Sequence, residues 1–192
     1  MYAITTTPGF IIESRPTGEA GKLLSIFTRD LGLVMASAPG IRLEKSKLRY
    51  HAQEYALGEF SFVRGKEFWR MTNAQAVRSD LQIWRSDLTA RIALLLRRLL
   101  HGEESHPELF QHVEASLLFL NGSNGLEHEQ MSTLESIIVF RMLHLLGYIG
   151  SDKEIDQQII SGELNAELLV SAVGQRTNIN KHINKALRES HL

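Results

Sequence analysis

The sequence predicts an α+β protein in which a β-sheet domain precedes an all-helical domain. Residues 1–78 contain short β-rich runs that are separated by glycine and proline turns. Beyond Arg78 the chain is rich in leucine and alanine, and its apolar residues recur at helical spacing. We therefore expect two domains, residues 1–80 and residues 81–192, which are joined near Val77–Gln82.

Five β-rich runs make up the first domain: Gly9–Ser14, Lys22–Thr28, Leu33–Ser37, Tyr55–Val63 and Phe68–Val77. Asp30-Leu31-Gly32 is a natural tight turn, and Arg64-Gly65-Lys66 turns the chain between the last two runs. Side chains alternate along a strand, and in a barrel this small we expect Phe60 and Phe62 to fill the core. Five short strands with one longer loop fit a closed barrel, with the OB-fold as the leading candidate. A five-stranded open sheet and an SH3-like barrel are the alternatives.

Six helices are predicted for the second domain. The first, Ile83–His101, contains no glycine, and Gly102 follows it as a cap. Its apolar residues Ile92, Leu95, Leu96 and Leu99 lie on one face. The others are Pro107–Leu120, Glu129–Leu146, Ile155–Ile160, Asn165–Val173 and Thr177–Arg188.

Composition excludes several classes of protein. The chain has 192 residues, 43% hydrophobic and 22% charged, which is ordinary for a soluble globular protein. It has no cysteine, which excludes disulfides and thiolate zinc sites and agrees with a cytoplasmic location. Met1–Pro8 does not resemble a signal peptide. The longest apolar stretch, near Ile137–Ile149, is broken by Arg141 and His144, so we expect no membrane span.

Charge is unevenly distributed between the two halves. Residues 1–80 hold 11 basic and 8 acidic residues, a net charge of +3. The remainder holds 10 basic and 14 acidic residues, a net charge of −4. This asymmetry favours an anionic partner for the first part of the chain.

The segment Gly40–Arg49, between the third and fourth runs, concentrates this positive charge. It carries one acid, Glu44, against the four cations Arg42, Lys45, Lys47 and Arg49. If the segment is extended, its last three cations project from one side. If it forms a helical turn, Arg42, Lys45 and Arg49 share a face. In either case three positive groups converge, which suits a phosphate backbone, although a solvated basic loop is the alternative interpretation.

Catalytic and metal-binding motifs are missing from the sequence. No Gly-x-Ser-x-Gly elbow, P-loop, Gly-x-Gly-x-x-Gly motif or His-Glu-x-x-His motif occurs. The spacing among four histidines and three nearby glutamates matches no compact zinc site, so we expect exposed or helix-end histidines. These residues are His101, His106, His112, His128, Glu103, Glu104 and Glu108. We therefore expect neither an enzyme nor a bound cofactor or metal.

Three further features each have a functional and a structural interpretation. Tyr50 directly follows Arg49 in the loop, so we expect an exposed ring that could stack on a base. Arg91 and Arg98 share a helix face, which either extends a positive track or is simply solvated. The apolar third helix, with Met142, Leu143, Leu145, Leu146 and Tyr148, either leaves a groove for a peptide tail or is buried in the helical core, which we favour.

Several segments together resemble a known family. In order and spacing, the first domain is similar to the opening domain of the bacterial recombination mediator RecO family. The segments that carry the likeness are Gly9–Ala20, Leu24–Gly32, Pro39–Arg42 and Lys45–Lys47. The likeness continues through Glu108–Phe110 and Leu143–Tyr148, and it covers most of residues 1–150.

The resemblance implies an OB-fold and a helical domain without enzymatic turnover. It implies binding to single- and double-stranded DNA, annealing of complementary strands, and cooperation with RecR in letting RecA replace single-stranded-DNA-binding protein. Contact with the acidic C-terminal tail of that binding protein is expected in the helical domain. Many members carry a four-cysteine zinc module after the equivalent of Leu146–Tyr148. This chain has no cysteine, so zinc is not carried over.

We therefore expect a DNA-binding surface on the barrel with little sequence preference. Arg42, Lys45, Lys47 and Arg49 are predicted to contact phosphates. Turns of the same barrel are predicted to help through Arg15, Arg29, Arg64 and Lys66. The alternative is an OB-fold protein–protein adaptor without intrinsic nucleic-acid binding.

Overall fold

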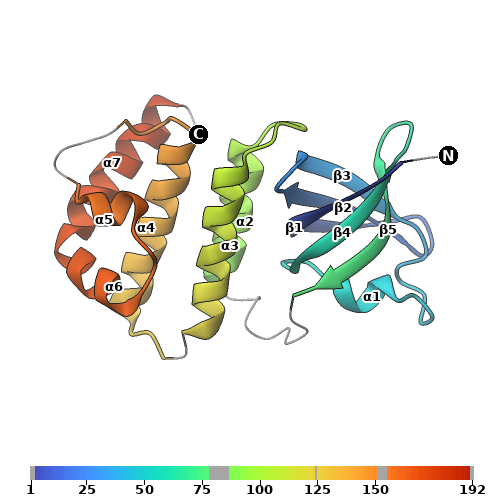
Figure 1. The fold of residues 1–192 in the computed structure, drawn as a ribbon, viewed down its shortest axis with the longest axis horizontal. Helices are drawn as coiled ribbons and strands as arrows, with labels where there is room; N and C mark the ends of the chain where they lie inside the picture. Colours follow the sequence, from blue (N-terminus) through green and yellow to red (C-terminus); the bar gives the residue numbers. More distant parts are fainter. Residues whose placement is uncertain (1–2, 78–86, 124, 151–154, 191–192) are drawn as a thin grey trace. The chain divides into compact units, whose positions relative to one another are not determined.

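The computed structural model describes residues 3–77, 87–123, 125–150 and 155–190. The chain forms two compact units, Met1–Phe110 and Gln111–Leu192 (Figure 1). The predicted junction Val77–Gln82 and the predicted start of the first helix at Ile83 fall mostly outside the described residues, between 78 and 86.

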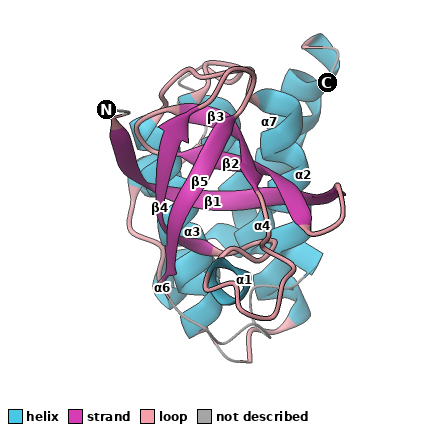
Figure 2. Ribbon diagram, turned by 90° about the vertical axis from the view of Figure 1, so that its right-hand side faces the viewer, coloured by secondary structure: helices cyan, strands magenta, loops and turns pink. Residues whose placement is uncertain are grey.

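The first unit contains a closed barrel with the strand order β1-β2-β3-β5-β4 (Figure 2). Its described strands are β1 Ile4–Thr17, β2 Gly21–Thr28, β3 Gly32–Ala38, β4 Leu57–Arg64 and β5 Trp69–Ala76. The long β1 pairs antiparallel with β4 through its first half and with β2 through its second half. A short parallel pairing of Ala36 with Trp69 joins β3 to β5 and closes the barrel. The predicted OB-fold followed by helices is confirmed, and the open sheet is wrong.

β1 begins five residues before the run Gly9–Ser14 that predicted it. Pro8 and Gly9 look like strand breakers in the sequence, yet both lie inside β1. Pro8 lacks a backbone donor, but its carbonyl accepts from the amide of Arg29 at 3.0 Å. A register shift between Ile11 and Glu13 bends the strand, so that its first half pairs with β4 and its second half with β2.

The barrel core is made of inward-facing apolar side chains. Phe60 and Phe62 are fully buried, as predicted, and their ring centroids lie 6.5 Å apart. Leu24 and Ile26 from β2 are also fully buried in this core. Ile41, from the loop after β3, is only 2% exposed and belongs to the same core, so this loop is anchored to the barrel.

A helical segment packs onto the barrel within the first unit. α2 (Asp87–Leu99) contacts β1, and the loop after it is bound to the turn between β2 and β3. The amide of Leu33 donates to the carbonyl of Gly102 at 3.0 Å. The start of α3 (Pro107–Gly122) brings Phe110 against Phe27 in an edge-on ring contact at 5.5 Å. These contacts bury the outward-facing Phe27 of β2 completely.

The second unit is built around α4 (His128–Leu145), which packs against α5 (Gln157–Ser161), α6 (Ala166–Ala172) and α7 (Arg176–Glu189). A short 3-10 turn, η1 (Val173–Gln175), joins α6 to α7. Because α4 has neighbours on several sides, it is apolar around most of its circumference. Met142 and Leu143 are buried in its core, as favoured, whereas Leu145 and Tyr148 keep more than a third of their surface exposed. Gly147, with φ +79°, ends α4, and the amide of Tyr148 returns to the carbonyl of Leu143.

Arg141, which interrupts the apolar pattern of α4, is buried and ties two helices together. It is 6% exposed, and its Nε and Nη2 donate to the carbonyls of Ile159 and Gln158 at 2.6 and 3.0 Å. Burial lowers the pKa of Arg141 to about 10. Nearby, Nε2 of His112 donates to the carbonyl of Ile138 at 3.2 Å. Burial, assisted by the charge of Arg141, lowers the pKa of His112 to about 4.

His112 therefore corrects one sequence-based expectation. We predicted exposed or helix-end histidines, but His112 lies inside α3 with its ring against α4. One helical turn further along α3, the hydroxyl of Ser116 donates to the backbone carbonyl of His112 at 2.7 Å.

Gly32 offers a test of the fit between the barrel and the loop after α2. Gly32 has φ +74°, and a side chain there would collide with the backbone of Glu104. Gly32→Ala should cost about 1–2 kcal/mol for the left-handed backbone and about 1–3 kcal/mol more for the collision. Gly18→Ala is the matched control, because Gly18 has φ +53° and nothing near its missing side chain. Urea unfolding should show the larger loss for Gly32→Ala, and equal losses would contradict this packing.

His112 predicts how the stability of the second unit depends on pH. Its pKa of about 4 in the folded state is lower than the ordinary histidine value of 6.5, so the unfolded chain takes up the proton first as the pH falls. The stabilisation is complete above pH 6.5 and is lost as the pH falls toward 4, at about 1.4 kcal/mol per unit of pH. His112→Gln keeps an N–H donor but does not titrate. Urea unfolding at pH 7 and pH 5 should give a smaller stability difference for the variant, and the same difference in both proteins would contradict the burial of a neutral His112.

Candidate functional site

The basic segment Gly40–Arg49 folds as a series of turns that lead into a short helix. The amides of Leu43 and Ser46 each return to the carbonyl three residues earlier, at 3.0 Å. α1 (Leu48–His51) follows, and Ala52 is fully buried beneath it. The extended alternative is therefore wrong. α1 was not predicted because it is only one turn long and carries no apolar repeat.

All four cations of this segment are exposed to solvent, and within the described part of the chain none forms an ion pair with a carboxylate. Arg42 is held in place by backbone carbonyls, since its Nη2 donates to Gly18 at 3.2 Å and also to Glu19. Lys45 and Lys47 project from the turns, and Arg49 lies on α1. The loop thus presents positive groups that form no ion pair with any acid the structure describes.

Two of these cations, Arg42 and Arg49, line a hollow at the barrel surface together with Lys22. Its remaining lining residues are Ile41 and Gln53, and its volume is about 310 Å³. Gln53 is fixed because its side-chain amide donates to the carbonyl of Arg49. The sequence did not indicate Lys22, because it occurs alone at the start of β2. Only the pairing of Lys22 with Ala38 places it beside the loop that follows β3.

Two of the predicted helper residues, Arg15 and Arg29, are bound to neighbouring acids. Arg15 Nη2 lies 2.9 Å from Glu13 Oε1, and Arg97 of α2 approaches the same oxygen at 2.6 Å. Arg29 Nε lies 3.0 Å from Asp30 Oδ1. Hydrogen bonds from Arg29 and from Thr7 hold the pKa of Asp30 below its usual value. These acids compete with any external anion for the two arginines.

Arg64, the third of these predicted residues, is bound both by a carboxylate and by an aromatic ring. Its Nη1 donates to both carboxylate oxygens of Glu103, at 2.7 and 2.5 Å. Its guanidinium also lies 4.8 Å from the centre of the Trp69 ring, and Trp69 Nε1 donates to Glu103 at 3.0 Å. Glu103 therefore links the loop after α2 to the β4–β5 hairpin.

Lys66, the fourth helper, is exposed in that hairpin but lies far from α1. His51 of α1 accepts from the amide of Ala76, which pairs with Gly58 near the start of β4. The hairpin lies at the other end of β4, beyond Arg64. At about 3.3 Å per residue, six residues of strand separate the two places by roughly 20 Å. The structure thus gathers Arg42 and Arg49 beside Lys22, and it does not gather Arg64 or Lys66 with them.

The exposed ring predicted beside the basic loop is confirmed, because Tyr50 is 67% exposed. Leu43, in the same loop, is also largely exposed. Arg91 and Arg98 are exposed on α2. Within the described ranges, no group of three His, Asp or Glu side chains converges to hold a metal ion. No helix in those ranges is long and apolar enough to span a bilayer.

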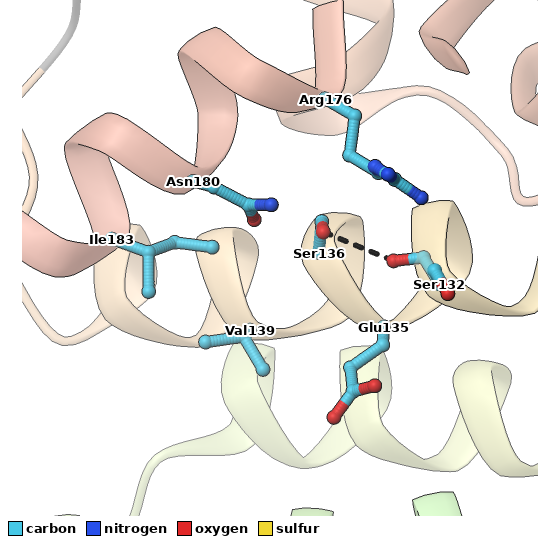
Figure 3. A pocket seen from close by; sticks show the side chains of 7 residues that line it. All are labelled: Ser132, Glu135, Ser136, Val139, Arg176, Asn180 and Ile183. Atoms are coloured by element: carbon cyan, nitrogen blue, oxygen red, sulfur yellow. Dashed lines mark hydrogen bonds between the residues drawn. The ribbon is translucent and has the colours of Figure 1, made fainter. Parts of the chain in front are cut away.

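The second unit has a hollow of about 400 Å³ between α4 and α7. Figure 3 shows Arg176 and Asn180 of α7 facing Ser132 and Ser136 of α4 across it. The apolar part of the lining comes from Val139 and Ile183. The Ser136 hydroxyl donates to the Ser132 carbonyl at 3.0 Å. This hollow combines one cation, Arg176, and one acid, Glu135, with the Asn180 amide, two serine hydroxyls and the apolar side chains.

Residues 1–79 match the family described as recombination protein O, N terminal. The chain is 32% identical over 125 residues to the DNA repair protein RecO of Dehalococcoides mccartyi, which covers 63% of this chain and 49% of the relative. It is 29% identical over 144 residues to RecO of Desulfitobacterium hafniense, which covers 72% of this chain and 50% of the relative. It is 27% identical over 162 residues to RecO of Gloeothece citriformis, which covers 81% of this chain and 54% of the relative. The chain spans about half the length of the curated relatives it matches.

Proposed function

Because the chain belongs to the RecO family of DNA repair proteins, we propose that it is a non-enzymatic, DNA-binding recombination mediator that acts in the cytoplasm. In this proposal residues 1–80 bind DNA and residues 81–192 dock partner proteins. The observation that carries it is the exposed cationic loop on the barrel, whose Lys45, Lys47 and Arg49 have no carboxylate partner within the described residues.

The loop cations bind DNA through its phosphates rather than through its bases. Each lysine or arginine that approaches a phosphate releases a condensed counterion, and this term is independent of sequence. Flexible Lys45 and Lys47 suit such contacts, because they follow the backbone without fixing its register. Single and double strands therefore both bind, with little sequence preference.

Annealing of complementary strands follows from the same electrostatics. Two strands repel each other through their phosphates, and protein cations that lie between them reduce this repulsion. Because the protein does not contact the bases for recognition, they remain free to pair with the complementary strand. Exposed Tyr50 adds a ring on which one base can stack, worth about 1–3 kcal/mol.

The chain acts with protein partners in this proposal. Together with RecR it lets RecA load onto DNA that is covered by single-stranded-DNA-binding protein. We assign the acidic C-terminal tail of that binding protein to the hollow between α4 and α7. Arg176 and the Asn180 amide supply donors for carboxylates, and Val139 and Ile183 supply apolar contact. Glu135 also lines the hollow, so the tail's carboxylates bind at its Arg176 side, away from this acid.

The alternative function is a protein–protein adaptor without intrinsic nucleic-acid binding. A specific observation favours it: Arg15, Arg29 and Arg64 of the barrel are already bound by acids. The net charge of residues 1–80 is only +3. A gel shift with a single-stranded oligonucleotide at low salt separates the two functions, because an adaptor gives no shift.

The salt dependence of DNA binding tests the assignment to the loop. Replacing Lys45, Lys47 and Arg49 by alanine should flatten the slope of log K against log salt by about two units on single strands, at about 0.7 per phosphate contact. Fluorescence anisotropy over a salt series measures this slope.

The matched control removes the same charge from cations that acids already neutralise. The triple variant Arg15→Ala, Arg29→Ala, Arg64→Ala should change the slope much less than the loop variant. Thermal unfolding of both variants checks that they are folded. An equal change in slope, or no change for the loop variant, would refute the assignment.

Binding of an acidic peptide tests the assignment to the second hollow. Arg176→Ala should weaken the binding of an aspartate-rich peptide with a free C-terminal carboxylate about tenfold, since a hydrogen bond to a charged group is lost. Arg188→Ala is the control, because Arg188 lies on the same helix outside the hollow. Titration calorimetry measures both, and equal weakening by the two variants would argue against this hollow.

A further inference from the structure

The hollow beside the basic loop gathers three cations from three different parts of the barrel unit. Lys22 comes from β2, Arg42 from the turns after β3, and Arg49 from α1. The other two lining residues, Ile41 and Gln53, carry no charge. No carboxylate belongs to the lining.

This arrangement has an electrostatic cost that the fold elsewhere avoids. Like charges in one hollow repel, and an apolar floor such as buried Ile41 strengthens that repulsion. Other arginines of the same unit are stabilised by Glu13, Asp30 and Glu103. The three hollow cations have no such acid among the described residues. A concave site lined by charge of one sign concentrates its field and attracts a counter-charge.

The hollow is also held in shape before any ligand arrives. Backbone carbonyls of Gly18 and Glu19 fix the Arg42 guanidinium, and the amide of Arg42 donates to Ala20 at 2.9 Å. The Gln53 side chain fixes the chain after α1 through the carbonyl of Arg49. The volume of about 310 Å³ is about ten times the roughly 30 Å³ share of one water molecule. A phosphoryl group with its ester oxygen and some water fits within it.

We propose that this hollow is a discrete site for a terminal phosphate monoester of a nucleic-acid strand. The inference rests on the proposed DNA binding and adds a ligand to it. A phosphate monoester carries a charge of about −1.5 to −2 near neutral pH, whereas a phosphate within a strand carries −1. Three convergent cations without an acid match the larger charge. Lys45 and Lys47 lie outside the hollow lining and serve the phosphates within the strand.

Oligonucleotides that differ only at their ends test the proposal. Short single strands of one sequence are prepared with a 5′-phosphate, with a 3′-phosphate, or with hydroxyls at both ends. Anisotropy at fixed ionic strength should show about tenfold tighter binding for at least one phosphorylated strand. The 5′ and 3′ strands identify which end enters the hollow. Equal affinity for all three strands would overturn the proposal.

Two variants locate the effect, and a third serves as the control. Arg49→Gln and Lys22→Gln remove charge from the hollow and keep a polar side chain, so each should reduce the gain from the end phosphate to about twofold or less. Lys45→Gln should weaken all three strands alike and leave that gain intact. If both hollow variants keep the full gain, the end phosphate binds elsewhere and the proposal fails.

Inorganic phosphate provides a probe that does not require a strand. At matched ionic strength it should displace the phosphorylated strand more effectively than chloride from the wild-type protein, and this advantage should vanish in Arg49→Gln. Displacement no better than that by chloride would overturn the proposal. These experiments distinguish failure of the end-phosphate site from failure of the proposed DNA binding. If strands bind through Lys45 and Lys47 but their ends are not distinguished, only the end site is wrong, whereas binding of no strand at all rejects the proposed function.

Discussion

Ile41 packs into the core of the barrel, and the position of the basic loop depends on this contact. The side chain is 2% exposed and shares its core with Phe60 and Phe62. Arg42 follows immediately and is fixed to the turn between β1 and β2 by carbonyl acceptors. An apolar anchor thus converts a segment rich in charged residues, which alone would be a mobile solvated loop, into a defined surface.

The distribution of acids then decides which cations remain available to a ligand. Glu13, Asp30 and Glu103 neutralise arginines that stabilise the barrel unit or join α2 and its following loop to it. Lys22, Arg42 and Arg49 line one hollow without an acid. Net charge does not distinguish the paired cations from the unpaired ones, because they differ in their ion pairs and not in the number of charges. A modest charge of +3 over residues 1–80 is therefore compatible with a local cationic site.

The sequence predicted the barrel, its strands and the helices beyond it, because alternation, glycine turns and helical spacing are local patterns. It missed features that depend on distant neighbours. β1 extends through Pro8, whose carbonyl accepts a hydrogen bond from the Arg29 amide in the turn after β2. Lys22 joins the site only through the register of β2 with β3. Arg64 lies at the far end of β4 and is bound by Glu103, which is 39 residues away in the chain. The burial of His112 could not be predicted from the sequence, because it depends on packing near Arg141, and an arginine in a sequence suggests an exposed position.

Lysine footprinting on the intact protein tests the central claim that DNA lies over the basic loop. Acetylation with mass spectrometry, with and without a single-stranded oligonucleotide, compares Lys45 and Lys47 with the exposed Lys181 and Lys185 of α7. We expect the oligonucleotide to protect the two loop lysines severalfold and to leave the α7 lysines as reactive as before. Unchanged reactivity of Lys45 and Lys47 under conditions where the oligonucleotide is bound would contradict the account.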